Sequence, residues 1–495
     1  MLLRGFTGSL LVLVGGLGVA TLPPTAPLLA WETVTDVRNS ELGRMTALTV
    51  VLVGLGLVAS AWLALCRRVA LADGDDRGAG LLLVRHAMVL WSAPLLLAPP
   101  LFSRDGWSYA AQGMLARVGI SPYEHGPSAL LPQGEAGLLL WHQYPIVQAV
   151  DPMWLDTAAP YGPLPIAAGA LMAVETGNPW VLVVGHRCVA LLGLLLLAWA
   201  VPRLASWGGV NPALASALVL VSPLMVANGV AGLHNDLLMV GLMAAALVTA
   251  VERGWAWGAV LGGAAAAVKL PGGLVCVGIA LATLPVAASL TDRLRRFAAV
   301  AVVSVGTLVA LGVVTGLGQG WFAALTVPGS ISTPLSITSL LGGALDWLAL
   351  QGGVGTEPAT FLELLRTLGV LASLVVAAGV ALRWRTGDRS ASVAAVAAVV
   401  AAFVVLCPVV HLWYFLWLTP FLASLELSRT AMSALLAGSV VLGMVAPLDS
   451  SLHGAYEAIV LACMVLAVLL PVLLLTRRSR ERIDRIASSR WLVVT

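Results

Sequence analysis

One polar stretch of this sequence, residues 102–163, collects carboxylates and aromatic side chains within an otherwise apolar chain. Its first carboxylate, Asp105, follows Arg104 and is flanked by Trp107 and Tyr109. A long polar segment between apolar runs is more often functional than a simple connector. A carboxylate beside aromatic rings suits sugar chemistry, because it can take the proton of an attacking hydroxyl. Asp105 is therefore a candidate general base, and the alternative is a helix-end carboxylate paired with Arg104.

Three adjacent polar residues, His234, Asn235 and Asp236, stand directly before another apolar run. Asn235 or Asp236 could cap a helix that begins there. A cap accounts for one polar residue, however, and not for three. The other interpretation is that these side chains bind sugar hydroxyls or a phosphate, and the sequence leaves both open.

Lys269 is the only lysine of the chain, and it lies in an apolar run that Pro271 and two glycines interrupt. A lone ammonium in such a setting needs an anion. The phosphate of a lipid-linked substrate would supply it, and a broken helix is tolerated in a membrane where it lines a cavity. Arg187, beside His186, is a second candidate for the phosphate.

The run His411, Leu412, Trp413, Tyr414 is a fourth polar and aromatic cluster at the end of an apolar segment. An aromatic belt at a membrane interface would explain Trp413, Tyr414 and Trp417. It would not explain His411. We therefore include His411, Trp413 and Tyr414 among the residues expected to line a site.

The composition indicates a membrane protein. The chain is 59% hydrophobic and only 10% charged, whereas a soluble protein carries about 25% charged residues. Apolar runs of about 20 residues recur along it, which predicts an all-α polytopic membrane protein. The net charge of +3 favours no particular partner, and the five cysteines have neither metal-site nor disulfide spacing. Residues 6–30 are expected to be a retained span rather than a cleaved signal.

Arginine-rich connections orient the chain, because such connections stay cytoplasmic. They place residues 102–163 and 319–358 outside, in one membrane domain over residues 1–476 with an Arg-rich cytoplasmic tail at 477–495. Residues 164–174 are too few to span and are expected to form a helix on the outer face. About fourteen spans are predicted, at 7–30, 45–66, 80–101, 181–201, 209–228, 235–252, 255–270, 272–290, 297–318, 359–382, 390–407, 412–426, 430–446 and 456–476.

A set of short motifs resembles a known family. The motifs are SRDGWSYAAQG at 103–113, SPY at 121–123, VDPMW at 150–154, APYGP at 159–163, HND at 234–236 and HLWY at 411–414. Together they are similar to the actinobacterial polyprenyl-phosphate-mannose-dependent α-1,6-mannosyltransferases, integral-membrane glycosyltransferases of the GT-C class. The resemblance covers residues 80 to 475 approximately.

The resemblance implies a GT-C fold in which Asp105, in the first large outer loop, is the general base of an inverting transfer. It implies a polyprenyl-phosphate-mannose donor and a phosphatidylinositol-mannoside or related glycolipid acceptor at the outer face of the cell membrane. Lys269 and Arg187 would bind the donor phosphate, and no metal or other cofactor is expected. The sugar and the acceptor would contact polar and aromatic side chains, namely Arg104, Trp107, Tyr109, Asp151, Tyr161, His234, Asn235, Asp236, His411, Trp413 and Tyr414.

Two other functions remain open from the sequence. A lipid-linked-sugar flippase or transporter would also have many spans and glycine- or proline-broken helices. Its polar groups should lie near the middle of the spans, however, whereas those of this chain gather at one face. A polymerase or ligase of lipid-linked glycans would share the outer loop and use another donor.

Overall fold

The computed structural model is built from helices, and no β-strand occurs among the described residues. Seven helices are long and apolar enough to cross a membrane, or eight if one bent pair counts as a span. The predicted all-α polytopic fold is thus confirmed, while the total of fourteen spans is not. The structure describes residues 1–71, 77–131, 145–325, 333, 335–355, 357–448 and 481. The predicted span at 456–476 lies outside these residues, as does the tail at 477–495 apart from Glu481.

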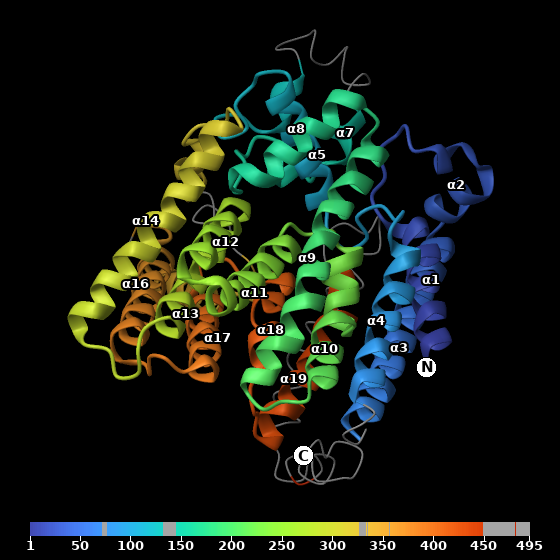
Figure 1. Ribbon diagram of the computed structural model, residues 1–495. Coiled ribbons are helices and arrows are strands. Elements are labelled where there is room, and N and C mark those ends of the chain that lie inside the picture. The colour runs from blue at the N-terminus through green and yellow to red at the C-terminus, as the bar shows by residue number, and fades with distance from the viewer. Residues whose placement is uncertain are drawn as a thin grey trace.

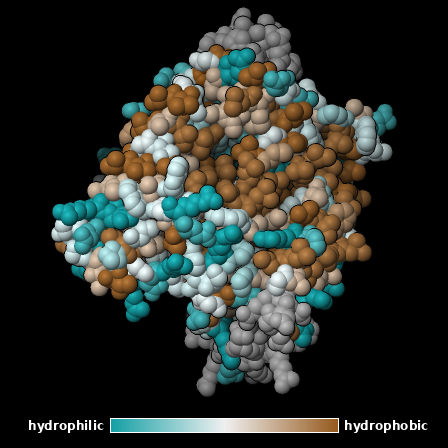
Figure 2. Space-filling model, in the orientation of Figure 1, coloured by the Kyte–Doolittle hydropathy of each residue, from teal (hydrophilic) through white to brown (hydrophobic). Residues whose placement is uncertain are grey.

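The long apolar helices are α1 (Leu2–Val19), α3 (Glu41–Ala70), α4 (Arg77–Ser92), α9 (Pro179–Trp207), α14 (Leu290–Val314), α16 (Thr360–Arg383) and α17 (Arg389–Leu406). The other α-helices are α2 (Glu32–Asn39), α5 (Asp105–Arg117), α7 (Pro145–Ala149), α8 (Pro163–Glu175), α10 (Pro212–Leu220), α11 (Asp236–Arg253), α12 (Trp255–Val268), α13 (Val275–Ala282), α15 (Ile337–Gln351), α18 (Thr419–Leu422) and α19 (Arg429–Met444). Hydrophobic residues cover a broad central part of the face seen in Figure 2. Large apolar side chains are exposed on α14 and α16, Val302 and Val375 among them, as expected for surfaces that contact lipid.

Several predicted spans are broken helices. The predicted span at 412–426 is a 3-10 turn, Leu412–Trp417, followed by the four-residue α18. The predicted span at 272–290 contains the end of the 3-10 turn Leu270–Leu274 and the eight-residue α13, and the predicted outer loop at 319–358 contains α15. Apolar composition does not distinguish a helix that crosses the membrane from one that is broken and buried against other helices. The spans predicted at these positions are therefore not confirmed as single long helices.

Helices α5, α7 and α8 gather at one end of the molecule (Figure 1). The predicted short helix at 164–174 is α8, which is not among the helices long enough to span. It packs closely on α5 because two glycines meet: a Cβ on Gly113 would lie 2.5 Å from the carbonyl carbon of Gly169. This contact fixes α5, and with it the side chains that α5 carries.

The connection from α10 to α11 has a distorted backbone. A π-helix, Met225–Ala231, follows α10 at a bend of 58°. Leu233 then has a φ of +58°, in the left-handed region that non-glycine residues rarely adopt. Directly after this residue come His234, Asn235 and Asp236, and α11 begins at Asp236. Strained residues and π-helical turns concentrate at functional sites.

Candidate active site

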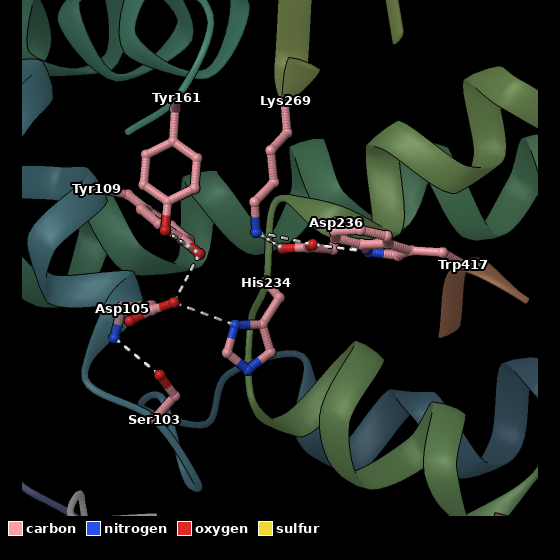
Figure 3. Close-up of polar contacts among 8 residues, drawn as sticks. All are labelled: Ser103, Asp105, Tyr109, Tyr161, His234, Asp236, Lys269 and Trp417. Atoms are coloured by element: carbon pink, nitrogen blue, oxygen red, sulfur yellow. Dashed lines mark hydrogen bonds and ion pairs between the residues drawn. The ribbon is translucent and has the colours of Figure 1, made fainter. Parts of the chain in front are cut away.

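The Asp105 carboxylate lies at the first residue of α5 and is 9% exposed. Its backbone N–H donates to the Ser103 hydroxyl at 3.0 Å. One turn along α5, the Tyr109 hydroxyl donates to Asp105 Oδ2 at 3.3 Å. From the distorted connection, His234 Nδ1 approaches the same oxygen at 3.4 Å, a long contact without ideal hydrogen-bond alignment. Figure 3 shows these groups converging on the carboxylate.

The pKa of Asp105 reflects two opposed effects. Burial alone would raise it, because a desolvated carboxylate is costly to ionise. The contact with His234 and the charges of His411 and Lys269 outweigh burial, and they hold the pKa below its ordinary value of 3.8. Asp105 is therefore an ionised carboxylate at neutral pH, in the protonation state that a general base requires.

A second buried carboxylate, Asp236, lies close to the first. Lys269 Nζ is 3.0 Å from its Oδ1 and 3.4 Å from its Oδ2. The Trp417 indole donates to Oδ1 at 2.8 Å. Three rings surround the ammonium, with their centroids at 4.3 Å (Tyr414), 5.3 Å (Trp417) and 5.7 Å (Tyr161). Lys269 is thus fixed by one carboxylate and by cation–π contacts. Figure 3 shows its contact with the Asp236 carboxylate.

Stacked rings connect the two carboxylates. The Trp413 ring lies 3.7 Å from the ring of His234 and 4.3 Å from that of His411, nearly parallel to both. Tyr161 and Tyr109 also belong to this cluster, with their hydroxyl oxygens 3.5 Å apart. The four polar clusters of the sequence therefore meet in one site, which unites Asp105, Tyr109, Tyr161, His234, Asp236, Lys269, His411, Trp413 and Tyr414.

Other predicted site residues lie elsewhere. Arg104 Nε donates to the Thr21 hydroxyl and the Trp107 indole to the Thr21 carbonyl, so both side chains hold the N-terminal segment. Trp107 is fully buried. Asp151 caps a 3-10 turn by accepting from the Met153 N–H. The structure thus gives these three side chains partners within the protein, and their contacts to sugar or acceptor stay predictions.

Two further predicted residues are buried beside the site. Asn235 is 5% exposed and its amide nitrogen has no hydrogen-bond partner among the described residues. Arg187 is 1% exposed, and all its donors are directed at backbone carbonyls. A phosphate could bind Arg187 only if those bonds broke, so the predicted phosphate contact is a poor fit.

Sequence reasoning missed two residues. Trp417 was assigned to an interfacial belt, although it lies one turn after Trp413 and Tyr414, on the side that reaches Asp236. His186 was only noted as a neighbour of Arg187, yet its ring centroid lies 5.9 Å from that of Tyr109. Helical spacing could have found Trp417, whereas nothing local in the sequence relates His186 to α5. Within the described part of the chain, no group of three His, Cys, Asp or Glu side chains could hold a metal ion.

Comparison with known proteins identifies the family. Residues 2–286 match the family model described as Alpha-(1->6)-mannopyranosyltransferase, N-terminal domain, and residues 337–477 match the MptB C-terminal domain. The chain belongs to the alpha-(1->6)-mannopyranosyltransferase family. It is 33% identical over 468 residues to alpha-(1->6)-mannopyranosyltransferase A of Mycobacterium tuberculosis, covering 92% of this chain and 85% of that protein. It is 29% identical over 456 residues to the B enzyme of Corynebacterium glutamicum, covering 85% and 72%. No solved structure matches.

The chain is accordingly a multi-pass membrane mannosyltransferase, which uses a sugar donor and a glycolipid acceptor. The N-terminal family match contains Asp105, His234, Asp236 and Lys269, while the C-terminal match contains Trp413. Both matched regions of this mannosyltransferase thus contribute side chains to the site described above.

Proposed function

We propose that the chain transfers mannose from polyprenyl-phosphate-mannose to the growing α-1,6-mannan core of lipomannan or a related glycolipid. The observation that carries this proposal is the buried, ionised Asp105 carboxylate, which lies close to His234 and Tyr109. A base of this kind is what an inverting glycosyl transfer requires from the protein. Family membership supports the sugar and the linkage.

The reaction follows from this arrangement. Asp105 takes the proton of an acceptor hydroxyl as the hydroxyl oxygen forms a bond to the anomeric carbon of a β-linked mannosyl phosphate. The bond from that carbon to the phosphate oxygen breaks, and the polyprenyl phosphate leaves with the electron pair. The anomeric configuration inverts to α. The leaving phosphate needs no proton, only stabilisation of its charge.

Lys269 is the group we assign to that stabilisation. Its ammonium has three N–H donors, and Asp236 occupies one side of it. The side chain is 12% exposed, and a phosphate oxygen would approach the ammonium from that exposed side. Leu270, the residue after Lys269, lines an apolar groove of about 270 Å³ together with Gly273, Phe297 and other residues. This groove would receive the first isoprene units of the donor.

The outer face of the cell membrane is the proposed place of reaction. Helices α5, α7 and α8 lie at one end of the molecule (Figure 1). The end of α9, where the sequence has Arg203, and the start of α14, where it has Arg293, lie away from that end (Figure 1). Arginine-rich connections favour the cytoplasmic side, which supports an outward orientation for the site.

Transfer of radiolabelled mannose tests the proposal. The purified protein is incubated in detergent with labelled polyprenyl-phosphate-mannose and a short phosphatidylinositol-mannoside. We expect label in the acceptor with the wild-type chain and none with Asp105→Asn, which retains donor binding. Normal transfer by Asp105→Asn would refute the assignment of the base. Donor binding without transfer by the wild-type chain would instead favour a flippase, which acts only in sealed vesicles.

A further inference from the structure

Irregular backbone delivers both Asp105 and His234 to the site. The chain between α4 and α5 is non-helical over residues 96–104, and the distorted connection of residues 221–235 precedes α11. Backbone carbonyls outside helices, or in the last turn of a helix, have no helical N–H partner. Away from water such carbonyls must find another donor, because an unsatisfied one is costly. Both segments therefore need donors from elsewhere in the molecule.

Arg187, which projects from α9, supplies such donors to both segments. Its Nε and Nη2 donate to the carbonyls of Val230 and Ala231, at 3.1 Å and 3.2 Å. Its other bonds reach the segment before α5, where Nη2 donates to Pro99 at 3.1 Å and Nη1 to Leu96 and Ala98. A guanidinium has five N–H donors, so its five donors match these five carbonyls.

The two segments also touch directly between these bonds and the reactive groups. The Leu101 N–H donates to the Ala231 carbonyl at 3.1 Å. A Cβ placed on Gly106 would lie 2.7 Å from Leu233 Cδ2, so the residue after Asp105 abuts the residue before His234. The left-handed Leu233 needs surroundings that hold it. Only Gly232 and Leu233 separate Ala231 from His234, so a shift at the carbonyls would move the imidazole.

We infer that Arg187 is a positioning residue, which fixes the distance between Asp105 and His234 by joining the backbone segments that carry them. This inference rests on the proposed function, since it assumes that Asp105 is the base. In this inference the buried Arg187 guanidinium sets the position of the base and does not bind the donor phosphate. Among the described residues no carboxylate lies within 4 Å of Arg187, so the carbonyl dipoles are the groups that stabilise its charge.

The chain offers a matched control for this role. Arg293 is also buried, at 9% exposure, and its guanidinium likewise donates to three backbone carbonyls, of Ala288, Ala381 and Trp384. Those carbonyls lie far along the chain from both segments that carry the site. Arg187→Gln and Arg293→Gln therefore remove the same kind of side chain, and only the first should disturb the base.

The experiment measures kcat, the KM for polyprenyl-phosphate-mannose, the pH profile of transfer and the melting temperature for both variants. A displacement of about 1 Å at a reacting group lowers the rate on the order of 100-fold. We expect a loss of that order in kcat for Arg187→Gln, with the KM for donor within about twofold of wild type. Arg293→Gln should lower the melting temperature and leave kcat and the pH profile unchanged.

The pH profile supplies a readout that a general loss of stability would not move. Asp105 is faced by His234 and Tyr109, and further away by Lys269, His411 and Asp236. In Arg187→Gln the His234 contact is lost, and burial then dominates the pKa of Asp105. The acid limb of the pH profile should therefore move to higher pH. Arg187→Lys, whose ammonium has three donors and cannot join both segments, should fold, show the same displaced limb and have an intermediate kcat. If Arg187→Gln fails to fold, the pH profile and kcat of Arg187→Lys test the inference in its place.

Two results would overturn the inference. One is a raised KM for donor with normal kcat and an unmoved acid limb, which would make Arg187 a phosphate ligand. The other is an equal effect of Arg187→Gln and Arg293→Gln on melting temperature alone. Asp105→Asn in the same assay distinguishes failure of this inference from failure of the proposed function, because an active Asp105→Asn would refute the proposed function. An inactive Asp105→Asn with a normal profile for Arg187→Lys would refute only the role of Arg187.

Discussion

The Lys269–Asp236 ion pair offers a prediction that separates stability from catalysis. The Lys269 side chain is 12% exposed and that of Asp236 is fully buried, with Nζ 3.0 Å from Oδ1. In Lys269→Met, the hydrogen bond from Trp417 is the one that Asp236 retains among the described residues. A buried charge that loses its partner destabilises a protein by about 3–5 kcal/mol. We expect Lys269→Met to lose stability of that order and all transfer activity.

The double variant Lys269→Met with Asp236→Asn removes both charges and keeps the shapes. Replacing a whole buried pair by neutral groups is often neutral in stability, so the double variant should unfold within about 1 kcal/mol of wild type. Transfer should remain lost, because no cation faces the departing phosphate. The exposed pair Arg203 and Glu252, 3.4 Å apart with side chains 41% and 42% exposed, is the control. Arg203→Gln should change stability by less than about 1 kcal/mol.

Denaturation in detergent and transfer of labelled mannose measure the two effects separately. A double variant that transfers mannose at the wild-type rate would show that Lys269 does not bind the phosphate. A Lys269→Met variant as stable as wild type would show that Asp236 is not held as a buried charge. The expected pattern is recovery of stability without recovery of activity, which would show that the pair acts in transfer and not only in folding.

Two further predictions concern the base and the helix that carries it. Transfer needs ionised Asp105, so activity is present above its pKa; because that pKa is lowered, the acid limb of the wild-type profile should lie below pH 3.8. In His234→Ala burial dominates, and the limb measured in the transfer assay should move to higher pH. Gly113→Ala should force α5 away from Gly169, with a loss of activity and about 1–3 kcal/mol of stability. Gly56→Ala, where a Cβ meets nothing within 4 Å, is the control in thermal unfolding.

The sequence predicted which side chains come together better than it predicted the helices that carry them. His234, Asp236, Lys269 and His411 stand out because a polar group in an apolar run needs a partner, and in this structure the partners are largely one another. Composition does not reveal where a helix breaks. The predicted span at 412–426, for example, is a 3-10 turn followed by a short helix.

Side-chain direction accounts for the other differences. Trp107 and Tyr109 are neighbours in sequence on α5, but a rotation of about 200° separates two residues two apart on a helix. Tyr109 therefore faces Asp105 while Trp107 turns to the N-terminal segment. Arg187 showed the sequence signature of an anion-binding residue, a cation within an apolar span. Its actual partners are carbonyls of residues far away along the chain, and no local pattern encodes them.

The interrupted helices explain how one site can be assembled from so many parts of the chain. Asp105 begins a helix, Asp236 begins another, Lys269 follows the last residue of α12, and His411 precedes a 3-10 turn. A side chain at a helix end can meet others across the bundle, whereas one in mid-helix faces its neighbours. Each interruption also frees backbone carbonyls that need donors. Residues such as Arg187, which supply the donors, therefore determine the geometry of the site without contacting the substrate.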